Sequence, residues 1–440
     1  MPPNIVIVGG GFGGLSAAQS LARAPVHVTL IDRHNYHLFR PMLYQVATGL
    51  LPADEIAAPI RSVLRRQANA DVLWAEVTGV DVAARRVLMG VESIPYDYLI
   101  LATGIKYSYF GHPEWAALAP SITTAEDAAR MRARLLSAFE EAERVAAQPD
   151  ADPRAVEALM TIVIVGGGTT GVELAGAVSE LARTSLVGDF RHIDTRRTRI
   201  ILFEAGPRIL PAFPEGLAAS AARHLRRMGV EVRTGTAVTG LDQDGVTVGA
   251  ERVPSRTVLW AAGVTASPAG RWLHADVDRA GKVRVGPDLS VPGHPEIFVI
   301  GDTATLVAPS RNLFGLRNAQ PMLMPGVAQP AIQEGHYVGA LIARRVRGRP
   351  APPPFSYWDK GDMAIVGRTF ALADLRFARL SGFVALLLWA GVHIFYLIDF
   401  ASRLLVVLQW TLSFLGSRRR VRIFSPELTE PIDAADLQPR

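Results

Sequence analysis

The chain has 440 residues, 49% of them hydrophobic, which predicts two or three domains with sizeable cores. The net charge is +5, and the basic residues are scattered until a late cluster of Arg418, Arg419, Arg420 and Arg422. This distribution argues against nucleic acid, and the cluster behind an apolar stretch suits an anionic membrane surface better than a solvated tail. The absence of cysteine excludes disulfide relays, thiolate nucleophiles, thiolate-ligated Fe–S clusters and cysteine-based zinc sites. The histidines show no zinc spacing, so no metal site is predicted.

The first predicted element is a buried strand that runs into a glycine turn and a helix. Ile5–Val8 leads into Gly9–Gly14, which carries the G-x-G-x-x-G spacing that places a pyrophosphate on a helix N-terminus. The next strand, Val26–Ile31, ends at Asp32, whose carboxylate can accept hydrogen bonds from ribose hydroxyls. We therefore expect a dinucleotide to be held by Gly9, Gly11, Gly14 and Asp32.

A further apolar strand, Tyr98–Leu101, continues into Ala102–Gly104. Thr124 and Asp127 then form a capping-box pattern, which predicts a helix that ends near Gln148. Because the first strand starts by Asn4, no room is left for a secretory signal peptide, and we expect a cytoplasmic protein.

The strand and glycine turn recur about 155 residues later, which indicates a domain duplication. Ile162–Val165 leads into Gly166–Gly171, and the following strand, Arg199–Phe203, ends at Glu204. The residues expected to hold this second dinucleotide are Gly166, Gly168, Gly171 and Glu204. Two dinucleotides in one chain indicate electron transfer from one to the other. A carboxylate at Glu204 repels a 2′-phosphate and favours NADH, although Arg208 keeps NADPH as an alternative.

The end of the chain is apolar but interrupted. Gly382–Ile398 has 17 residues without a formal charge if His393 is neutral, and Leu404–Leu415 adds 12. Both fall short of the roughly 20 residues that span a bilayer. We expect two interfacial helices that seat the protein on a membrane; a short inserted hairpin and a buried soluble interface are the alternatives. The aromatic residues suited to the headgroup boundary are Trp389, Tyr396 and Trp410, and Asp399 and Arg403 are spaced to pair.

These motifs resemble the two-dinucleotide-binding flavoprotein superfamily. Gly301-Asp302 is similar to its second FAD motif, and Ala102–Gly104 and Ala261–Gly263 resemble its two crossover segments. The resemblance implies an α/β fold of two Rossmann-like domains, one inserted in the other, plus a C-terminal membrane-associating α-helical module. The implied ranges are 1–120 and 286–350 for the FAD domain, 121–285 for the NADH domain and 351–440 for the module. It adds Thr103, Gly104 and Asp302 to the FAD site and Gly263 to the NADH site.

Three further stretches resemble the type II NADH:quinone oxidoreductases within that superfamily. They are Asp32–Gly49, Ala328–Gln333 with the A-Q-x-A-x-Q pattern, and Lys360–Ala364 with the K-G-x-M-A pattern. The thiol-disulfide and sulfide:quinone branches need cysteines, so the chain cannot belong functionally to either.

This resemblance implies the remaining site residues. Glu173, expected in the first helical turn of the NADH domain, would orient the nicotinamide or relay protons; complementing the helix N-terminus is the alternative. Gln329 and Gln333 share a helix face and would meet the quinone; a solvated polar face is the alternative. Only three of the 46 lysines and arginines are lysines, and Lys360 would act near the quinone through its compact ammonium or simply pair with a carboxylate.

The implied function is a respiratory NADH dehydrogenase that passes a hydride from NADH to non-covalent FAD and two electrons to a membrane quinone, without proton pumping. The expected place is the cytoplasmic face of the membrane, with a homodimer left open. One alternative is an NAD(P)H-dependent reductase of a soluble acceptor such as ferredoxin. A non-enzymatic, redox-sensing flavoprotein is another, and it predicts slow turnover with every acceptor.

Overall fold

The computed structural model describes residues 1–316, 320–398, 400–415, 422–425 and 428. The chain divides into two compact units, each assembled from three stretches. Unit 1 comprises Met1–Leu38, Ala57–Lys106 and Val264–Lys360, and unit 2 comprises Phe39–Ile56, Tyr107–Gly263 and Gly361–Arg440. The units change over at 38/39, 56/57, 106/107, 263/264 and 360/361, whereas the sequence-based boundaries stand at 120/121, 285/286 and 350/351.

Unit 1 is built on a six-stranded sheet. Its strands, in spatial order, are β20 (Ser290–Val291), β21 (His294–Val299), β9 (Tyr98–Leu101), β1 (Asn4–Val8), β2 (His27–Asp32) and β5 (Ala70–Trp74). All neighbours are parallel except β20 and β21. Val8 pairs with Ile31 and Leu101, so the carboxyl ends of these strands meet at one edge, where ligands of open α/β sheets bind.

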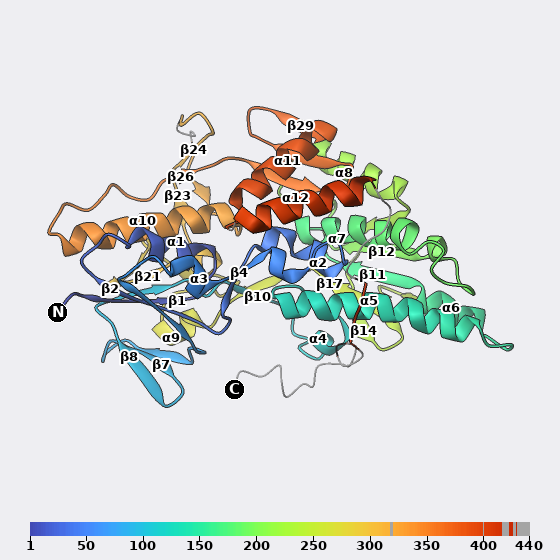
Figure 1. The fold of residues 1–440 in the computed structure, drawn as a ribbon, viewed down its shortest axis with the longest axis horizontal. Coiled ribbons are helices and arrows are strands. Elements are labelled where there is room, and N and C mark those ends of the chain that lie inside the picture. The colour runs from blue at the N-terminus through green and yellow to red at the C-terminus, as the bar shows by residue number, and fades with distance from the viewer. Residues whose placement is uncertain (317–319, 399, 416–421, 426–427, 429–440) are drawn as a thin grey trace. The chain divides into compact units, whose positions relative to one another are not determined.

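Both faces of this sheet are covered, which explains the continuous apolar run of β1. Ile5 and Ile7 pack toward α1 (Phe12–Ser20) and α10 (Ala328–Val346). Val6 and Val8 pack toward α9 (Ala269–Leu273) and the antiparallel sheet of β6 (Gly79–Asp81), β7 (Arg86–Met89) and β8 (Glu92–Pro95). Figure 1 shows the helices α1 and α10 on one side of the sheet and β7, β8 and α9 on the other.

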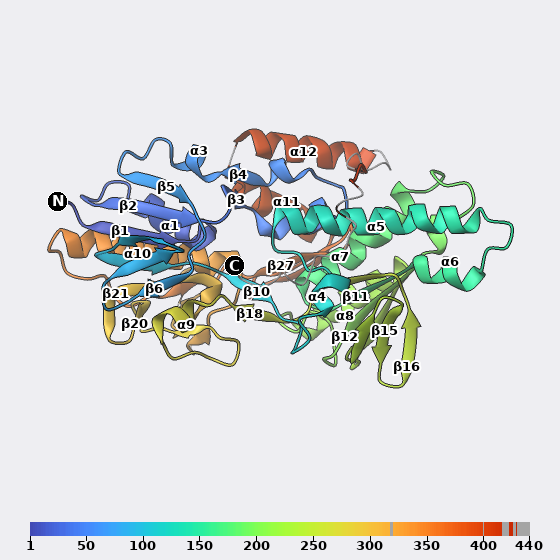
Figure 2. The same ribbon diagram turned by 90° about the horizontal axis from the view of Figure 1, so that it is seen from below.

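Unit 2 contains a second, four-stranded parallel sheet. Its order is β13 (Val230–Thr234), β12 (Arg199–Glu204), β11 (Thr161–Val165) and β17 (Thr257–Trp260). One face packs on the antiparallel sheet of β14 (Gly240–Asp242), β15 (Gly245–Val248) and β16 (Glu251–Pro254). The helices α5 (Ala125–Ala146) and α7 (Thr169–Glu180) lie on the other side (Figure 2). The predicted capping box of Thr124 and Asp127 is confirmed, and α5 ends two residues before the predicted Gln148.

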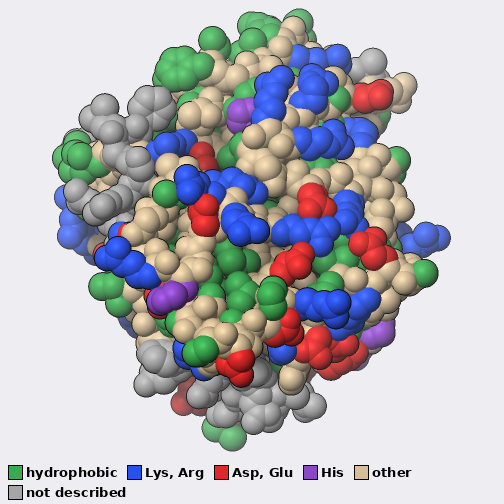
Figure 3. Space-filling model, turned by 90° about the vertical axis from the view of Figure 1, so that its right-hand side faces the viewer, with side chains coloured by type: hydrophobic (Ala, Val, Ile, Leu, Met, Phe, Trp, Pro, Cys, Tyr) green, Lys and Arg blue, Asp and Glu red, His purple; other side chains and the backbone are tan. Residues whose placement is uncertain are grey.

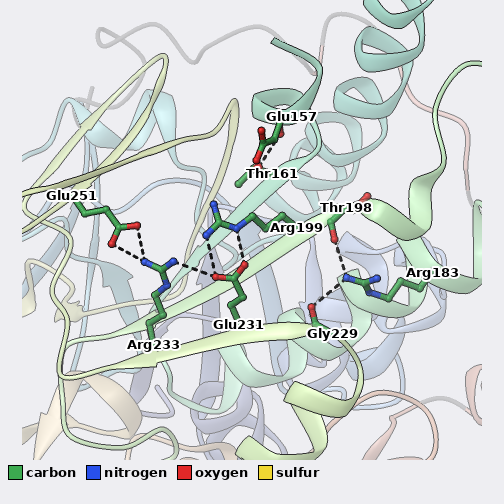
Figure 4. Close-up of polar contacts among 9 residues, drawn as sticks. All are labelled: Glu157, Thr161, Arg183, Thr198, Arg199, Gly229, Glu231, Arg233 and Glu251. Atoms are coloured by element: carbon green, nitrogen blue, oxygen red, sulfur yellow. Dashed lines mark hydrogen bonds and ion pairs between the residues drawn. The ribbon is translucent and has the colours of Figure 1, made fainter. Parts of the chain in front are cut away.

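Ion pairs tie the strands of unit 2 together at the surface. Glu231 on β13 accepts hydrogen bonds from Arg199 and Arg233, and Arg233 also donates to Glu251 on β16 (Figure 4). Such exposed pairs contribute little individually, and a network on neighbouring strands mainly fixes their alignment. Acidic and basic side chains are likewise interspersed on the face shown in Figure 3.

The last part of unit 2 is a three-stranded antiparallel sheet followed by two helices. The strands are β27 (Asp362–Ile365), β28 (Ala371–Asp374) and β29 (Arg379–Gly382), and the helices are α11 (Phe383–Tyr396) and α12 (Phe400–Leu415). No described helix is long and apolar enough to cross a bilayer. Asp399 and the cluster Arg418–Arg420 lie outside the described residues, and Arg422 pairs with Asp189.

One prediction about these helices is wrong. Trp389 on α11 is only 1% exposed, because its ring stacks on His393 and packs against Trp410 of α12. It therefore cannot lie at a headgroup boundary. Burial lowers the pKa of His393 to about 4, which agrees with the neutral form assumed from the sequence. On α12, the Trp410 indole donates to the Gln45 side chain at 2.8 Å, which fastens the helix to the segment Phe39–Ile56.

Candidate functional site

The first glycine cradle lies between β1 and α1 in unit 1. Gly9 has φ +105°, and a Cβ there would lie 2.3 Å from the Ala102 carbonyl oxygen. A Cβ on Gly14 would lie 1.8 Å from the Gly9 carbonyl oxygen, so only glycine lets helix and turn approach this closely. Gly11 caps α1 without a side-chain hydrogen bond, and no atom of the described residues lies within 4 Å of its Cβ position. The positive end of the helix dipole therefore faces free space, which suits a pyrophosphate.

The other residues predicted for this site meet at the same sheet edge. Asp32 accepts hydrogen bonds from the N–H groups of Gly10 (2.5 Å) and His34 (2.7 Å). Burial alone would raise the pKa of Asp32, but these hydrogen bonds and His34 outweigh it and lower that pKa. The carboxylate keeps further lone pairs for ribose hydroxyls. At the neighbouring strand ends, the hydroxyl of Thr103 contacts those of Ser267 and Thr303.

The Gly301-Asp302 turn is held by a residue that sequence reasoning missed. Glu334 on α10 is 2% exposed, and its carboxylate accepts a hydrogen bond from the Gly301 N–H at 2.6 Å. Burial raises the pKa of Glu334 to about 7; the Gly301 N–H opposes this rise, and Asp302 adds to it. The signal was available in the sequence, because Glu334 falls on the buried, helically spaced stripe of α10 that includes Ala331 and Val338.

The second cradle repeats this geometry in unit 2. Gly166 has φ +110°, and its Cβ would lie 2.6 Å from the Ala261 carbonyl oxygen. A Cβ on Gly171 would lie 1.8 Å from the Gly166 carbonyl oxygen. Gly168 caps α7 without a side-chain hydrogen bond, and again no described residue has an atom within 4 Å of its Cβ position. The two cradles therefore have the same local chemistry.

Glu204 closes this second site at the end of β12. Its two carboxylate oxygens accept hydrogen bonds from the N–H groups of Gly167 and Gly206, both at 2.6 Å. Arg208, the residue that kept the NADPH alternative open, donates to the backbone carbonyls of Leu210, Pro211 and Phe213. The Arg208 guanidinium therefore forms its hydrogen bonds with the backbone of its own loop.

Glu173 lies deeper in α7 than predicted. The helix begins at Thr169, so Glu173 falls beyond the first turn, and the prediction of a first-turn position is wrong. The side chain is 7% exposed, and its nearest hydrogen-bond donor is the Ile365 N–H at 3.4 Å. Burial raises the pKa of Glu173 well above its usual range, against the opposing effect of that N–H. Burial thus disfavours the charged form of Glu173, which argues against the alternative role of complementing the helix dipole.

The residues predicted for the quinone lie together in unit 1. Gln329 and Gln333 both lie on α10, as their spacing predicted. The Gln333 amide donates to the Trp358 carbonyl (3.0 Å) and accepts from the Trp358 N–H (2.8 Å). The ammonium of Lys360 lies 4.7 Å from the centre of the Trp358 ring. The Oε1 atom of Gln329, one turn earlier on α10, is buried and has no hydrogen-bond partner within the part of the chain that the structure describes.

Known proteins with a similar sequence match this chain over most of its length. The family model described as pyridine nucleotide-disulphide oxidoreductase matches residues 3–335. The chain is 44% identical over 436 residues to the type II NADH:quinone oxidoreductase Ndh of Mycobacterium tuberculosis, which covers 95% of this chain and 90% of that protein. It is 31% identical to the demethylphylloquinone reductase NdbB of Synechocystis, covering 94% of this chain and 97% of that protein.

The fold is similar to that of a solved relative. The structure of NDH2 from Plasmodium falciparum in complex with NADH aligns with a TM-score of 0.82, covering 95% of this chain and 99% of that chain. The two sequences are 19% identical, so this likeness concerns the fold alone.

Proposed function

The chain belongs to the pyridine nucleotide-disulphide oxidoreductases and, within them, to the type II NADH:quinone oxidoreductases, and we propose that it oxidises NADH and reduces a quinone through bound FAD. The observation that carries this function is the 44% identity over nearly the whole chain to a named enzyme of this type. NADH gives up a hydride, and the quinone takes up two electrons and two protons. FAD, when bound, supplies the two-electron chemistry that links these half-reactions.

The geometry of unit 1 supports an FAD site at the first cradle. The pyrophosphate would rest at the start of α1, in the open space beside Gly11. Asp32 would accept hydrogen bonds from the adenosine ribose. Thr103, Gly104 and Asp302 would line the flavin half, and Glu334 holds the Asp302 turn in place through Gly301.

The second cradle supports NADH rather than NADPH. The Glu204 carboxylate would lie beside the 2′-phosphate of a bound NADPH, and the two negative charges would repel each other. Arg208 is bound to three carbonyls and does not offset that repulsion. Gly263 would accommodate the nicotinamide half at the end of β17. Glu173 is a buried acid with a raised pKa two residues past this cradle, and its proposed role is proton transfer toward the quinone.

At the quinone, we assign different tasks to the two glutamines. Gln329 is assigned to contact with the substrate, and its buried Oε1 atom, which has no hydrogen-bond partner among the described residues, supports this role. Gln333 acts through Trp358, because both ends of its amide hold the backbone of that residue. The Trp358 ring in turn positions Lys360, whose ammonium can stabilise the negative charge that develops on a quinone oxygen.

Stopped-flow spectroscopy of the purified protein tests the function directly. NADH should bleach the flavin absorbance rapidly and NADPH slowly, and a short-chain quinone should then restore the oxidised spectrum. The preference for NADH follows from the Glu204 carboxylate, and the reoxidation by quinone follows from the proposed quinone residues around Lys360. Slow reoxidation by quinone, together with rapid reoxidation by a one-electron protein acceptor, would favour the ferredoxin-type alternative. Slow reoxidation by both would favour the redox sensor.

Replacing Lys360 with arginine should slow flavin reoxidation by quinone about tenfold and leave flavin reduction by NADH unchanged. A guanidinium is larger, and it cannot release a proton as a desolvated ammonium can. The two half-reactions are read separately in the same stopped-flow series. An unchanged quinone half-reaction in Lys360→Arg would contradict the compact-ammonium argument.

Membrane attachment is proposed for the exposed apolar faces of α11 and α12. The exposed large apolar residues of the two helices and the link between them are Phe383, Val384, Leu387, Phe395, Ile398, Leu404, Leu405, Val407, Leu408 and Leu412. So many large apolar side chains are rarely left facing water. Since quinones dissolve in lipid, a protein seated on the bilayer can take its substrate from it. The cytoplasmic side and the homodimer remain predictions from the sequence.

The double variant Leu404→Glu/Leu408→Glu should reduce co-sedimentation with anionic vesicles at least fivefold, because each exposed leucine that enters lipid contributes about 1.5–3 kcal/mol. Oxidation of NADH by a water-soluble quinone should be unaffected. Unchanged vesicle binding with dissociation of a dimer would instead assign this surface to a subunit interface.

A further inference from the structure

A reverse turn at Tyr109–His112 in unit 2 carries an unusual residue at its tip. The His112 N–H donates to the Tyr109 carbonyl at 3.0 Å, and the two central residues, Phe110 and Gly111, have φ of +52° and +95°. Positive φ at both central positions is the pattern of a type I′ turn, where glycine, asparagine and aspartate are favoured. A bulky aromatic residue is disfavoured there by steric contact with its own backbone.

Burial does not account for the phenylalanine. The Phe110 side chain is 65% exposed, so it adds little to the core. Its ring lies against the α-carbon of Gly263, where three ring carbons would be 2.5–3.1 Å from an added Cβ. A strained residue that the fold does not need for packing is a candidate for a functional contact.

Hydrogen bonds fix this turn to the end of β17. The Trp260 indole N–H donates to the Ser108 carbonyl at 3.0 Å, and the Ser108 N–H donates to the Gly263 carbonyl at 3.3 Å. The ring centres of Phe110 and Trp260 are 6.2 Å apart. Phe110 is thus held beside Gly263 by its backbone as well as by its ring.

The strand order places this ring beside one half of the dinucleotide. The central strand β11 leads into the cradle, with β12 and Glu204 on one side and β17 on the other. A dinucleotide with its pyrophosphate on the cradle and its adenosine ribose at Glu204 must extend its nicotinamide half toward β17. There Gly166 abuts the Ala261 carbonyl, and Gly263 follows two residues later.

We propose that Phe110 forms one wall of the nicotinamide end of the NADH site and contacts the nicotinamide through the open face of its ring. The inference rests on the proposed function. A flat aromatic face suits the flat pyridine ring, since such rings attract each other in offset or edge-on arrangements. The strained turn is the means by which the chain presents this ring at the sheet edge.

The test compares NAD⁺ with ADP-ribose, which lacks the nicotinamide, by isothermal titration of the FAD-loaded protein. NAD⁺ is used because it does not reduce oxidised flavin. In Phe110→Asn, the asparagine suits positive φ, so the turn is kept while the ring is lost. The dissociation constant of NAD⁺ should rise about 3- to 10-fold, and that of ADP-ribose less than twofold. Phe110→Tyr should retain the affinity of the unaltered protein for NAD⁺.

Phe377→Asn is the matched control, because Phe377 is also an exposed phenylalanine of unit 2 and lies in the turn between β28 and β29. It should change neither affinity. Equal weakening of NAD⁺ and ADP-ribose by Phe110→Asn would overturn the proposal, and so would unchanged affinity for both. A protein that binds neither ligand in its unaltered form would overturn the proposed function itself.

Discussion

Gly168→Ala should weaken NADH binding while unit 2 stays folded. Gly168 has φ −70° and ψ −176°, an extended conformation that alanine adopts without strain, and its Cβ position has no atom within 4 Å in the described part of the chain. The added methyl group therefore meets only the space proposed for the pyrophosphate. Overfilling a close-packed contact costs about 1–3 kcal/mol, or roughly 5- to 150-fold in a dissociation constant. Titration with NAD⁺ and the KM for NADH measure the change, and the thermal midpoint without nucleotide should stay the same.

The first cradle offers the reciprocal variant. Gly11 has φ −70° and ψ −167° and is equally open, so Gly11→Ala should loosen FAD and leave the NAD⁺ affinity of the flavin-loaded fraction unchanged. FAD retained after gel filtration is the readout. Loss of FAD from Gly168→Ala with full NAD⁺ affinity would reverse the assignment of the two cradles. Full retention of both ligands in both variants would remove the pyrophosphates from these helix starts.

The nucleotide cradles could be predicted from sequence because each is a local device. The close approach of Gly14 to the Gly9 carbonyl oxygen involves residues only five positions apart, and Asp32 lies at the end of the next strand. Parallel pairing then brings Ala102 to the same edge without further information. For the same reason the four-residue spacing of Gln329 and Gln333 correctly predicted one helix for both.

Contacts between segments that lie far apart in the sequence could not be predicted from it. Nothing in the spacing shows that Gln333 holds the backbone of Trp358, 25 residues away, or that Trp410 bonds to Gln45. The prediction for Trp389 was wrong for this reason, since a tryptophan within an apolar helix suits a membrane boundary and a protein core equally well. The contact with Trp410 shows that Trp389 belongs to the protein core.

Glu173→Gln should slow the reoxidation of the flavin by quinone about 100-fold and leave its reduction by NADH nearly unchanged. The amide can still accept the Ile365 N–H, but it cannot release or take up a proton. Positioned proton transfer contributes on the order of 10²–10⁴-fold to a reaction. Single-turnover measurements of the two half-reactions separate this role from orientation of the nicotinamide, which would slow the reduction instead.

The stability of the same variant provides an independent check. The pKa of Glu173 is raised in the folded state, which therefore favours the protonated acid. The resulting contribution to folding stability is fully present below the unfolded pKa near 4.5 and is lost as the pH rises through the folded pKa. The amide introduced by Glu173→Gln does not ionise, so the variant should melt at an equal or higher temperature than the unaltered protein at pH 8. The control is Glu180→Gln in the same helix, whose carboxylate accepts the Arg368 N–H at 2.6 Å and which should keep full quinone turnover. A stabilised Glu173→Gln protein with full quinone turnover would reduce Glu173 to a structural acid.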